Sequence, residues 1–225
     1  EDIDWIHSNN QSMNANLENI QNSEYTFVIL RNPYERLASA FWDKFVTGTN
    51  DCYSNEKSKE IFQSILKTNK DENSINSFKD FVNTLWENPL LISKDTHLRY
   101  QTDYLLLTNY NDYFTLKEFK ALQKKVLEQS NLIITDTRDI TKHTTYGYTY
   151  TDDSSYSCCT LKELNSIKSR DMVIKYDNFY DEEDSYKVTL LYLNDIVTYI
   201  EKIKDLNSTR DYLRKALTYS TNYQI

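Results

Sequence analysis

The chain contains very little glycine, and this scarcity excludes two common kinds of nucleotide site. Gly48 and Gly147 are the only glycines among its 225 residues. A Rossmann fingerprint requires three glycines within six positions, and a Walker A loop requires two glycines followed by lysine. Two widely separated glycines can form neither motif, so any phosphate held by this sequence must be bound by side chains and helix N-termini.

Cysteine is also scarce, and long apolar runs are absent. Cys52, Cys158 and Cys159 form no C-x-x-C pair and show neither zinc-ligand spacing nor a disulfide framework. We therefore expect no metal site. The sequence has no apolar run of 18 residues, which excludes a transmembrane helix within it. Its first ten residues are acidic and polar, unlike a signal peptide.

The sequence has fewer basic than acidic residues. The sequence has 26 Lys and Arg against 34 Asp and Glu, a formal net charge of −8. This balance argues against broad binding to nucleic acid or to an anionic membrane surface, although a local basic pocket remains compatible with it. The 19 Tyr, 9 Phe and 3 Trp argue against disorder. The length suits one large domain, and we expect a single domain over residues 1–225.

Residues 25–45 read as a strand, a tight turn and a helix. The run over 25–30 is rich in aromatic and β-branched residues and predicts a strand buried on both faces, as in a parallel sheet. Asn32 and Pro33 then suit a helix start. Apolar residues recur at helical spacing through 34–45, with Phe41 in the middle of the stripe.

The rest of the chain is mostly helical in pattern. A polar stretch over 48–76 resembles a surface insertion, and 135–160 reads as a loop rich in Thr, Tyr and Ser. The capping residues Ser77, Thr115 and Thr160 mark helix starts. The sequence therefore predicts an α/β fold with few strands: a second strand over 132–134, and helices over 78–86, 115–129, 161–168, 184–203 and 209–219.

The strand–turn–helix unit carries the chemistry. A buried strand places Arg31 at its C-terminal end, where ligands bind in open α/β sheets. The following helix presents its N-terminus, Ser39 lies in its second turn, and Arg36 adds a cation. These groups together describe a phosphate site. The alternative is that Arg31 only pairs with Glu35 or solvent and that Ser39 is a packing residue.

Residues 31–45, RNPYERLASAFWDKF, resemble the 3′-phosphate-binding motif of sulfotransferases that use PAPS (3′-phosphoadenosine 5′-phosphosulfate). They are most similar to the carbohydrate sulfotransferase group, with its R-[DEN]-P-[FY]-x-R-L-x-S-A-[FY]-x-[DN]-K-F run. Weaker matches follow in the same order. Residues 97–105 resemble an H-x-x-P-Q stretch, with Tyr100 in place of proline, and 142–145 resemble a nucleotide-side segment. Residues 180–196 resemble a closing helix with a Tyr-x-x-Asp pattern.

The resemblance implies a P-loop-like three-layer α/β sulfotransferase fold with a small parallel sheet and many helices. It implies that Arg31 and Ser39 hold the 3′-phosphate of PAPS, and of the product PAP. Lys142, Thr144 and Thr145 are secondary candidates around the adenosine or a phosphate. The implied reaction is sulfuryl transfer from PAPS to a hydroxyl, and it requires no metal.

The sequence departs from the family before Arg31. Relatives carry a lysine-containing loop there that holds the 5′-phosphosulfate, whereas the first lysine of this sequence is Lys44. We therefore expect the N-terminal 5′-phosphosulfate loop segment to be missing from residues 1–225. Without that loop, the chain as given should bind the nucleotide poorly and transfer sulfate slowly or not at all.

Transfer to a hydroxyl also needs a base. His7 precedes Arg31 roughly where the heparan 2-O-sulfotransferase branch has its catalytic histidine, and it is the preferred candidate. His97 lies in the H-x-x-x-Q stretch and is the second. His143 is a weaker alternative beside the nucleotide-side segment, and Glu35 is a carboxylate that could serve instead. Each histidine can equally be a structural or surface residue.

Two classes of function compete. The first is a PAPS-dependent sulfotransferase acting on a carbohydrate or a small hydroxylated metabolite. The second is a non-catalytic nucleotide- or glycan-binding module derived from the same fold, which a missing 5′-loop would favour. A P-loop-like kinase is disfavoured by the two glycines. The cysteine pattern favours a cytoplasmic location, with the Golgi lumen of animal relatives as the alternative.

Overall fold

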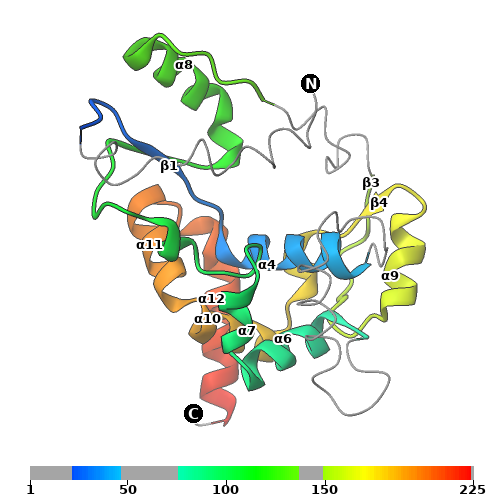
Figure 1. Cartoon of the computed structure of the whole chain (residues 1–225). Helices are drawn as coiled ribbons and strands as arrows, with labels where there is room; N and C mark the ends of the chain where they lie inside the picture. Colours follow the sequence, from blue (N-terminus) through cyan, green and yellow to red (C-terminus); the bar gives the residue numbers. More distant parts are fainter. Residues whose placement is uncertain (1–21, 47–75, 137–148, 224–225) are drawn as a thin grey trace. The chain divides into compact units, whose positions relative to one another are not determined.

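The computed structural model describes residues 22–46, 76–136 and 149–223 (Figure 1). Their contacts define two compact units, each of which is described separately below. The first unit comprises residues 22–29 and 105–134 of the described chain. The second comprises the other described residues and contains the predicted phosphate-binding helix.

The first unit is a short parallel sheet followed by a helix. Strand β1 (Phe27–Ile29) pairs in parallel with β2 (Asp112–Phe114). The Tyr25 hydroxyl donates to Asp112 at 2.9 Å beside this pair. The helix begins as a 3₁₀ turn, η3 (Leu116–Glu118), and continues as α8 (Phe119–Ser130). The capping box predicted at Thr115 is confirmed, because Glu118 accepts from the Thr115 backbone N–H at 2.8 Å.

Two strand predictions need correction in this unit. The strand predicted over 25–30 is shorter, and the residues of β1 are only half-buried rather than buried on both faces. The strand predicted over 132–134 is wrong, because Leu132 and Ile133 are exposed and lie in no strand. Helix α8 ends at Asn131 in the left-handed conformation, and the chain then follows the surface. The partner of β1 is instead β2, whose sequence DYF has no strong strand signal.

In the second unit, α4 (Pro33–Phe41) forms where the apolar stripe predicts a helix. Asn32 is the N-cap, and its side chain accepts from the Tyr34 backbone N–H at 3.0 Å. Pro33 occupies the first turn, where its missing N–H costs nothing. The helical stripe continues to the expected end as a π-helical turn, η1 (Trp42–Val46).

The core of this unit is built from aromatic rings around α4. The Phe41 side chain is fully buried. Its ring lies 5.2 Å from the ring of Phe78 and 5.8 Å from that of Phe179. Both distances are within the range of favourable aromatic pairs. Other elements of the unit are α6 (Phe78–Glu87), α7 (Leu90–Lys94), η2 (Gln101–Tyr104), β3 (Thr149–Tyr150), α9 (Leu161–Lys168), β4 (Met172–Val173) and η4 (Tyr176–Phe179).

Three helices complete the unit: α10 (Glu182–Leu191), α11 (Leu193–Ile203) and α12 (Asn207–Tyr223), with α10 packed along α12 (Figure 1). The single helix predicted over 184–203 is wrong, because the chain breaks at Tyr192 (φ −113°, ψ 25°). The buried Tyr192 hydroxyl donates to the Leu98 carbonyl at 2.8 Å, which stabilises the break. The last helix is longer than predicted at both ends.

The predicted α/β class is confirmed. The described chain is rich in helices and contains two small sheets, β1–β2 and β3–β4, and both are parallel.

The start of α10 buries a carboxylate. Asp181 caps the helix and forms an ion pair with Lys79 at 2.7 Å, as expected for a charge cluster at a helix start. Asp184 is fully buried and accepts a hydrogen bond from the Ser157 hydroxyl. The pKa of Asp184 is raised to about 6, mainly by burial and in part by Asp181, although the Ser157 hydrogen bond and the charge of Lys79 act in the opposite direction.

This carboxylate should make stability depend on pH. Asp184 binds its proton more tightly in the folded protein than in the unfolded chain. The free energy of unfolding should therefore fall as pH rises from about 4 to about 6. The expected fall from this group is up to about 3 kcal/mol. Urea unfolding at pH 4.5 and 7.5 should show that Asp184→Asn removes this fall. Asp171→Asn, at an exposed carboxylate, should retain it, and an unchanged pH dependence in Asp184→Asn would contradict the prediction.

Candidate functional site

The backbone of Arg31 is held by one amide side chain. The Arg31 N–H donates to Gln101 Oε1, and Gln101 Nε2 donates to the Arg31 carbonyl, both at 2.9 Å. The amide thereby pairs with the chain just before α4 in the manner of a neighbouring strand. Because the N–H and the carbonyl of Arg31 are both fixed, the position from which its side chain extends is fixed as well.

Gln101 is positioned in turn by a buried carboxylate on α11. Asp195 is 2 % exposed and accepts from the Gln101 N–H at 2.7 Å. It also accepts from the N–H and the hydroxyl of Thr102, at 3.0 and 2.9 Å. Asp195 is the aspartate of the Tyr-x-x-Asp pattern, and it caps η2. The sequence pattern was the only signal for this residue, and it did not reveal the contact with Gln101.

The N-terminus of α4 offers fewer donors than expected. Pro33 has no N–H, and the Asn32 side chain already accepts from the Tyr34 N–H. An anion bound here would therefore depend mainly on side chains. The Arg31 guanidinium and the Ser39 hydroxyl are half-buried and have no hydrogen-bond or ion-pair partner among the described residues. A cation and a hydroxyl that are both available fit a phosphate group.

Arg36 has a structural role that differs from the role predicted for Arg31. Its guanidinium donates to the Thr96 carbonyl at 3.2 Å, so it connects α4 to the loop that follows α7. Together with Gln101, this bond fixes the loop over 95–101 against the start of α4. The structure thus brings the predicted residues Arg31 and His97 onto two segments that are hydrogen-bonded to each other.

His97 has a carboxylate partner that the sequence did not indicate. Its backbone N–H donates to Asp95 Oδ1 at 2.7 Å, and its ring Nδ1 lies 3.2 Å from the same oxygen. Asp95 is buried, whereas the His97 side chain is 47 % exposed. Burial alone would raise the pKa of Asp95, but hydrogen bonds from His97 and Leu98 hold it below its ordinary value. An ionised Asp95 can orient the ring and leave Nε2 directed away from it.

Five candidate site residues lie outside the described residues and remain predictions: His7, Lys142, His143, Thr144 and Thr145. Phe41, Trp42 and Phe45 are core residues, as the stripe predicted. No group of three or more metal-ligating side chains gathers within residues 22–46, 76–136 and 149–223. Over the same ranges, no helix is long and apolar enough to cross a membrane.

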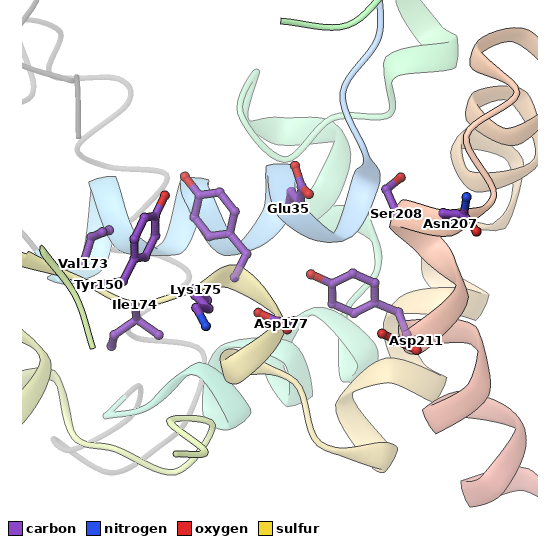
Figure 2. Close-up of a pocket in the computed structure, with 11 residues that line it drawn as sticks. Glu35, Tyr150, Val173, Ile174, Lys175, Asp177, Asn207, Ser208 and Asp211 are labelled. Atoms are coloured by element: carbon purple, nitrogen blue, oxygen red, sulfur yellow. The ribbon is translucent and has the colours of Figure 1, made fainter. Parts of the chain in front are cut away.

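A pocket of about 460 Å³ runs beside α4 (Figure 2). Glu35 of α4, Ser208 and Asp211 lie towards one end in this view, and Tyr150 and Val173 lie towards the other. Its walls come from α4, β3, β4 with the following turn, and the start of α12. The pocket is therefore lined by segments that are far apart in the sequence.

A family model described as Sulfotransferase family matches residues 2–200. This match covers most of the chain, and the chain therefore belongs to the sulfotransferase family. Membership supports a sulfotransferase enzyme that moves a sulfuryl group to a hydroxylated acceptor. No curated protein and no solved structure matches the chain.

Proposed function

We propose that the chain transfers the sulfuryl group of PAPS to a hydroxyl of a carbohydrate or small metabolite. The observation that supports the donor is the pair of available groups on α4 and before it, the Arg31 guanidinium and the Ser39 hydroxyl. Both occupy their places in the 3′-phosphate motif, and Gln101 fixes the Arg31 backbone. Lys142, Thr144 and Thr145 complete the proposal as contacts to the adenosine or a phosphate.

The proposed chemistry is an in-line displacement at sulfur. The acceptor oxygen forms a bond to sulfur while the bond from sulfur to the phosphate oxygen breaks, and PAP leaves with that electron pair. The acceptor proton passes to a base. Among the described residues, His97 suits this role best because Asp95 holds its Nδ1 side and the ring is accessible. His7, which the sequence analysis prefers, lies outside the described residues and is the other candidate base.

Arg31→Ala should weaken PAP binding by ~10- to 100-fold, because hydrogen bonds to a charged group contribute about 1.5–3 kcal/mol. Adenosine 5′-phosphate lacks the 3′-phosphate, so the variant should bind it as the unchanged protein does. Isothermal titration calorimetry with both nucleotides measures this difference.

Arg170→Ala is the matched control, because Arg170 is an exposed arginine in the turn after α9, and among the described residues its side chain bonds only to Ser166 of that helix. It should bind PAP normally. Equal affinity of the unchanged protein for the two nucleotides would refute the 3′-phosphate site, as would unimpaired PAP binding by Arg31→Ala.

A further inference from the structure

The pocket beside α4 has aromatic walls. Tyr150, Tyr176 and Tyr212 all line it. Tyr212 stacks on Tyr34 with ring centroids 4.4 Å apart and an interplanar angle of 6°, so this wall is rigidly supported by the core. Aromatic faces suit the apolar face of a small ring or an organic cation. A volume of about 460 Å³ is sufficient for a ligand of that size.

The charge in the pocket is negative. Glu35, Asp177 and Asp211 line it against one cation, Lys175. The Lys175 ammonium lies 2.6 Å from Asp153, a carboxylate that does not line the pocket, so its charge is already balanced.

The three carboxylates that line the pocket have few partners of their own. Of these three carboxylates, only Asp211 forms an ion pair with another described residue, and its partner is Arg214 at 3.6 Å. The Lys215 ammonium is bound to the backbone carbonyls of Asp177 and Tyr180 and does not line the pocket. The pocket therefore favours a cation and repels an anion.

The hydroxyl of a mostly buried tyrosine in the pocket wall gives an independent sign of a ligand. Tyr212 is 5 % exposed and lines the pocket, yet its hydroxyl has no hydrogen-bond partner within the described part of the chain. Burial raises the pKa of this phenol, and Glu35 and Asp177 raise it further, so the hydroxyl stays protonated close to these carboxylates. A phenol in this state is available to hydrogen-bond to a hydroxyl or amine of a ligand.

The pocket adjoins the predicted donor residues. Glu35 lies four residues after Arg31 and four before Ser39, which places Glu35 and Ser39 on one face of α4. At the same end, the Asn32 side chain donates to the Ser208 carbonyl at 2.8 Å, and Ser208 lines the pocket. A ligand here would therefore lie beside the segment assigned to the 3′-phosphate.

We propose that this pocket binds the acceptor, and that it selects a hydroxylated ring carrying a protonated amine over the same ring carrying a carboxylate. Here the tyrosines contact the ring, the carboxylates Glu35, Asp177 and Asp211 pair with the ammonium, and the Tyr212 hydroxyl bonds a ring substituent. This inference rests on the proposed sulfotransferase function and narrows its acceptor to an amine-bearing sugar or polyol.

Dissociation constants for glucosamine, glucose and glucuronate, measured by ligand-observed NMR at pH 7 and low salt, test the selection. Glucosamine should bind ~10-fold more tightly than glucuronate, with glucose between them, because each exposed charge pair contributes about 0.2–1 kcal/mol. The double variant Asp177→Asn/Asp211→Asn should reduce this ratio to about twofold. Glu128→Gln removes one exposed carboxylate of α8 that does not line the pocket, and it should leave the ratio unchanged.

Three results would overturn the proposal: glucuronate binding as tightly as glucosamine, an unchanged ratio in the double variant, or displacement of glucosamine by PAP. The last result would assign the pocket to the nucleotide. The sugar titrations contain neither PAPS nor PAP, so they are independent of the Arg31→Ala experiment. If Arg31→Ala binds PAP normally, the 3′-phosphate site is refuted. The preference of the pocket for glucosamine over glucuronate would still stand on the sugar titrations alone.

Discussion

His97→Ala should lower the turnover number for sulfuryl transfer by ~10²–10⁴-fold, which is the contribution that a general base makes. His97 is held through Asp95 and does not belong to the 3′-phosphate motif, so PAP affinity should change by less than about threefold. Single-turnover transfer of radiolabelled sulfate from PAPS, followed over a pH series in the protein at its natural full length, measures the chemical step separately from product release.

Thr96→Ala is the control for this loop. Thr96 contacts Arg36 through its backbone carbonyl, which the substitution retains, so this variant should transfer at the normal rate. His7→Ala decides between the two candidate bases. If His7→Ala causes the large fall while His97→Ala raises only the KM for the acceptor, then His7 is the base and His97 contributes only to acceptor binding.

Phe41→Ala should lower the free energy of unfolding by about 3–5 kcal/mol, the range for removing a buried phenylalanine from a packed core. Phe41 is fully buried, and its ring is within 6 Å of the rings of Phe45, Phe78, Phe81 and Phe179. These neighbours come from α6, η1 and η4, so the cavity has walls from several elements and cannot close by a movement of one side chain. Urea denaturation followed by tryptophan fluorescence gives the change.

Leu217→Ala is the matched control, because Leu217 is 68 % exposed on α12. Its effect should lie within about 0.5 kcal/mol. A loss below about 1 kcal/mol for Phe41→Ala would show that the aromatic cluster is not the core of this unit. The same variant should also weaken PAP binding if α4 loses its fixed position, since Ser39 lies on that helix.

Local signals in the sequence predicted the starts of helices well. Asn32, Ser77 and Thr160 all accept backbone N–H groups as helix caps, as their types and positions indicated. Such caps depend on residues within one turn, and a single sequence contains them. The break at Tyr192 was missed because it depends on a hydrogen bond to Leu98, which is remote in sequence.

Strand pairing was the weakest part of the prediction for the same reason. The strand predicted over 132–134 has the stronger apolar pattern, but β1 pairs with Asp112–Phe114. The pairing is supported by hydrogen bonds from Thr26 to the Asn111 side chain, which no local propensity reveals. Register between distant segments is a property of the folded chain and not of either segment alone.

The candidate site was predictable in part. A specific motif indicated Arg31 and Ser39, and within the described residues neither side chain has a hydrogen-bond or ion-pair partner. The residues that position them were not predicted, because Gln101 and Asp195 act through contacts between segments about 70 and 94 residues apart. Asp95, two residues before His97, was the one partner that sequence proximity could have suggested.

Transfer of ³⁵S from labelled PAPS to an amino sugar, by the protein at its natural full length, tests the central claim most directly. We expect labelled sulfate ester to form with the unchanged protein, and its formation to fall ~10-fold or more in Arg31→Ala at a PAPS concentration below the dissociation constant. PAP binding that depends on Arg31, with no labelled ester formed from any hydroxylated acceptor tested, would contradict the claim and identify a nucleotide-binding module instead.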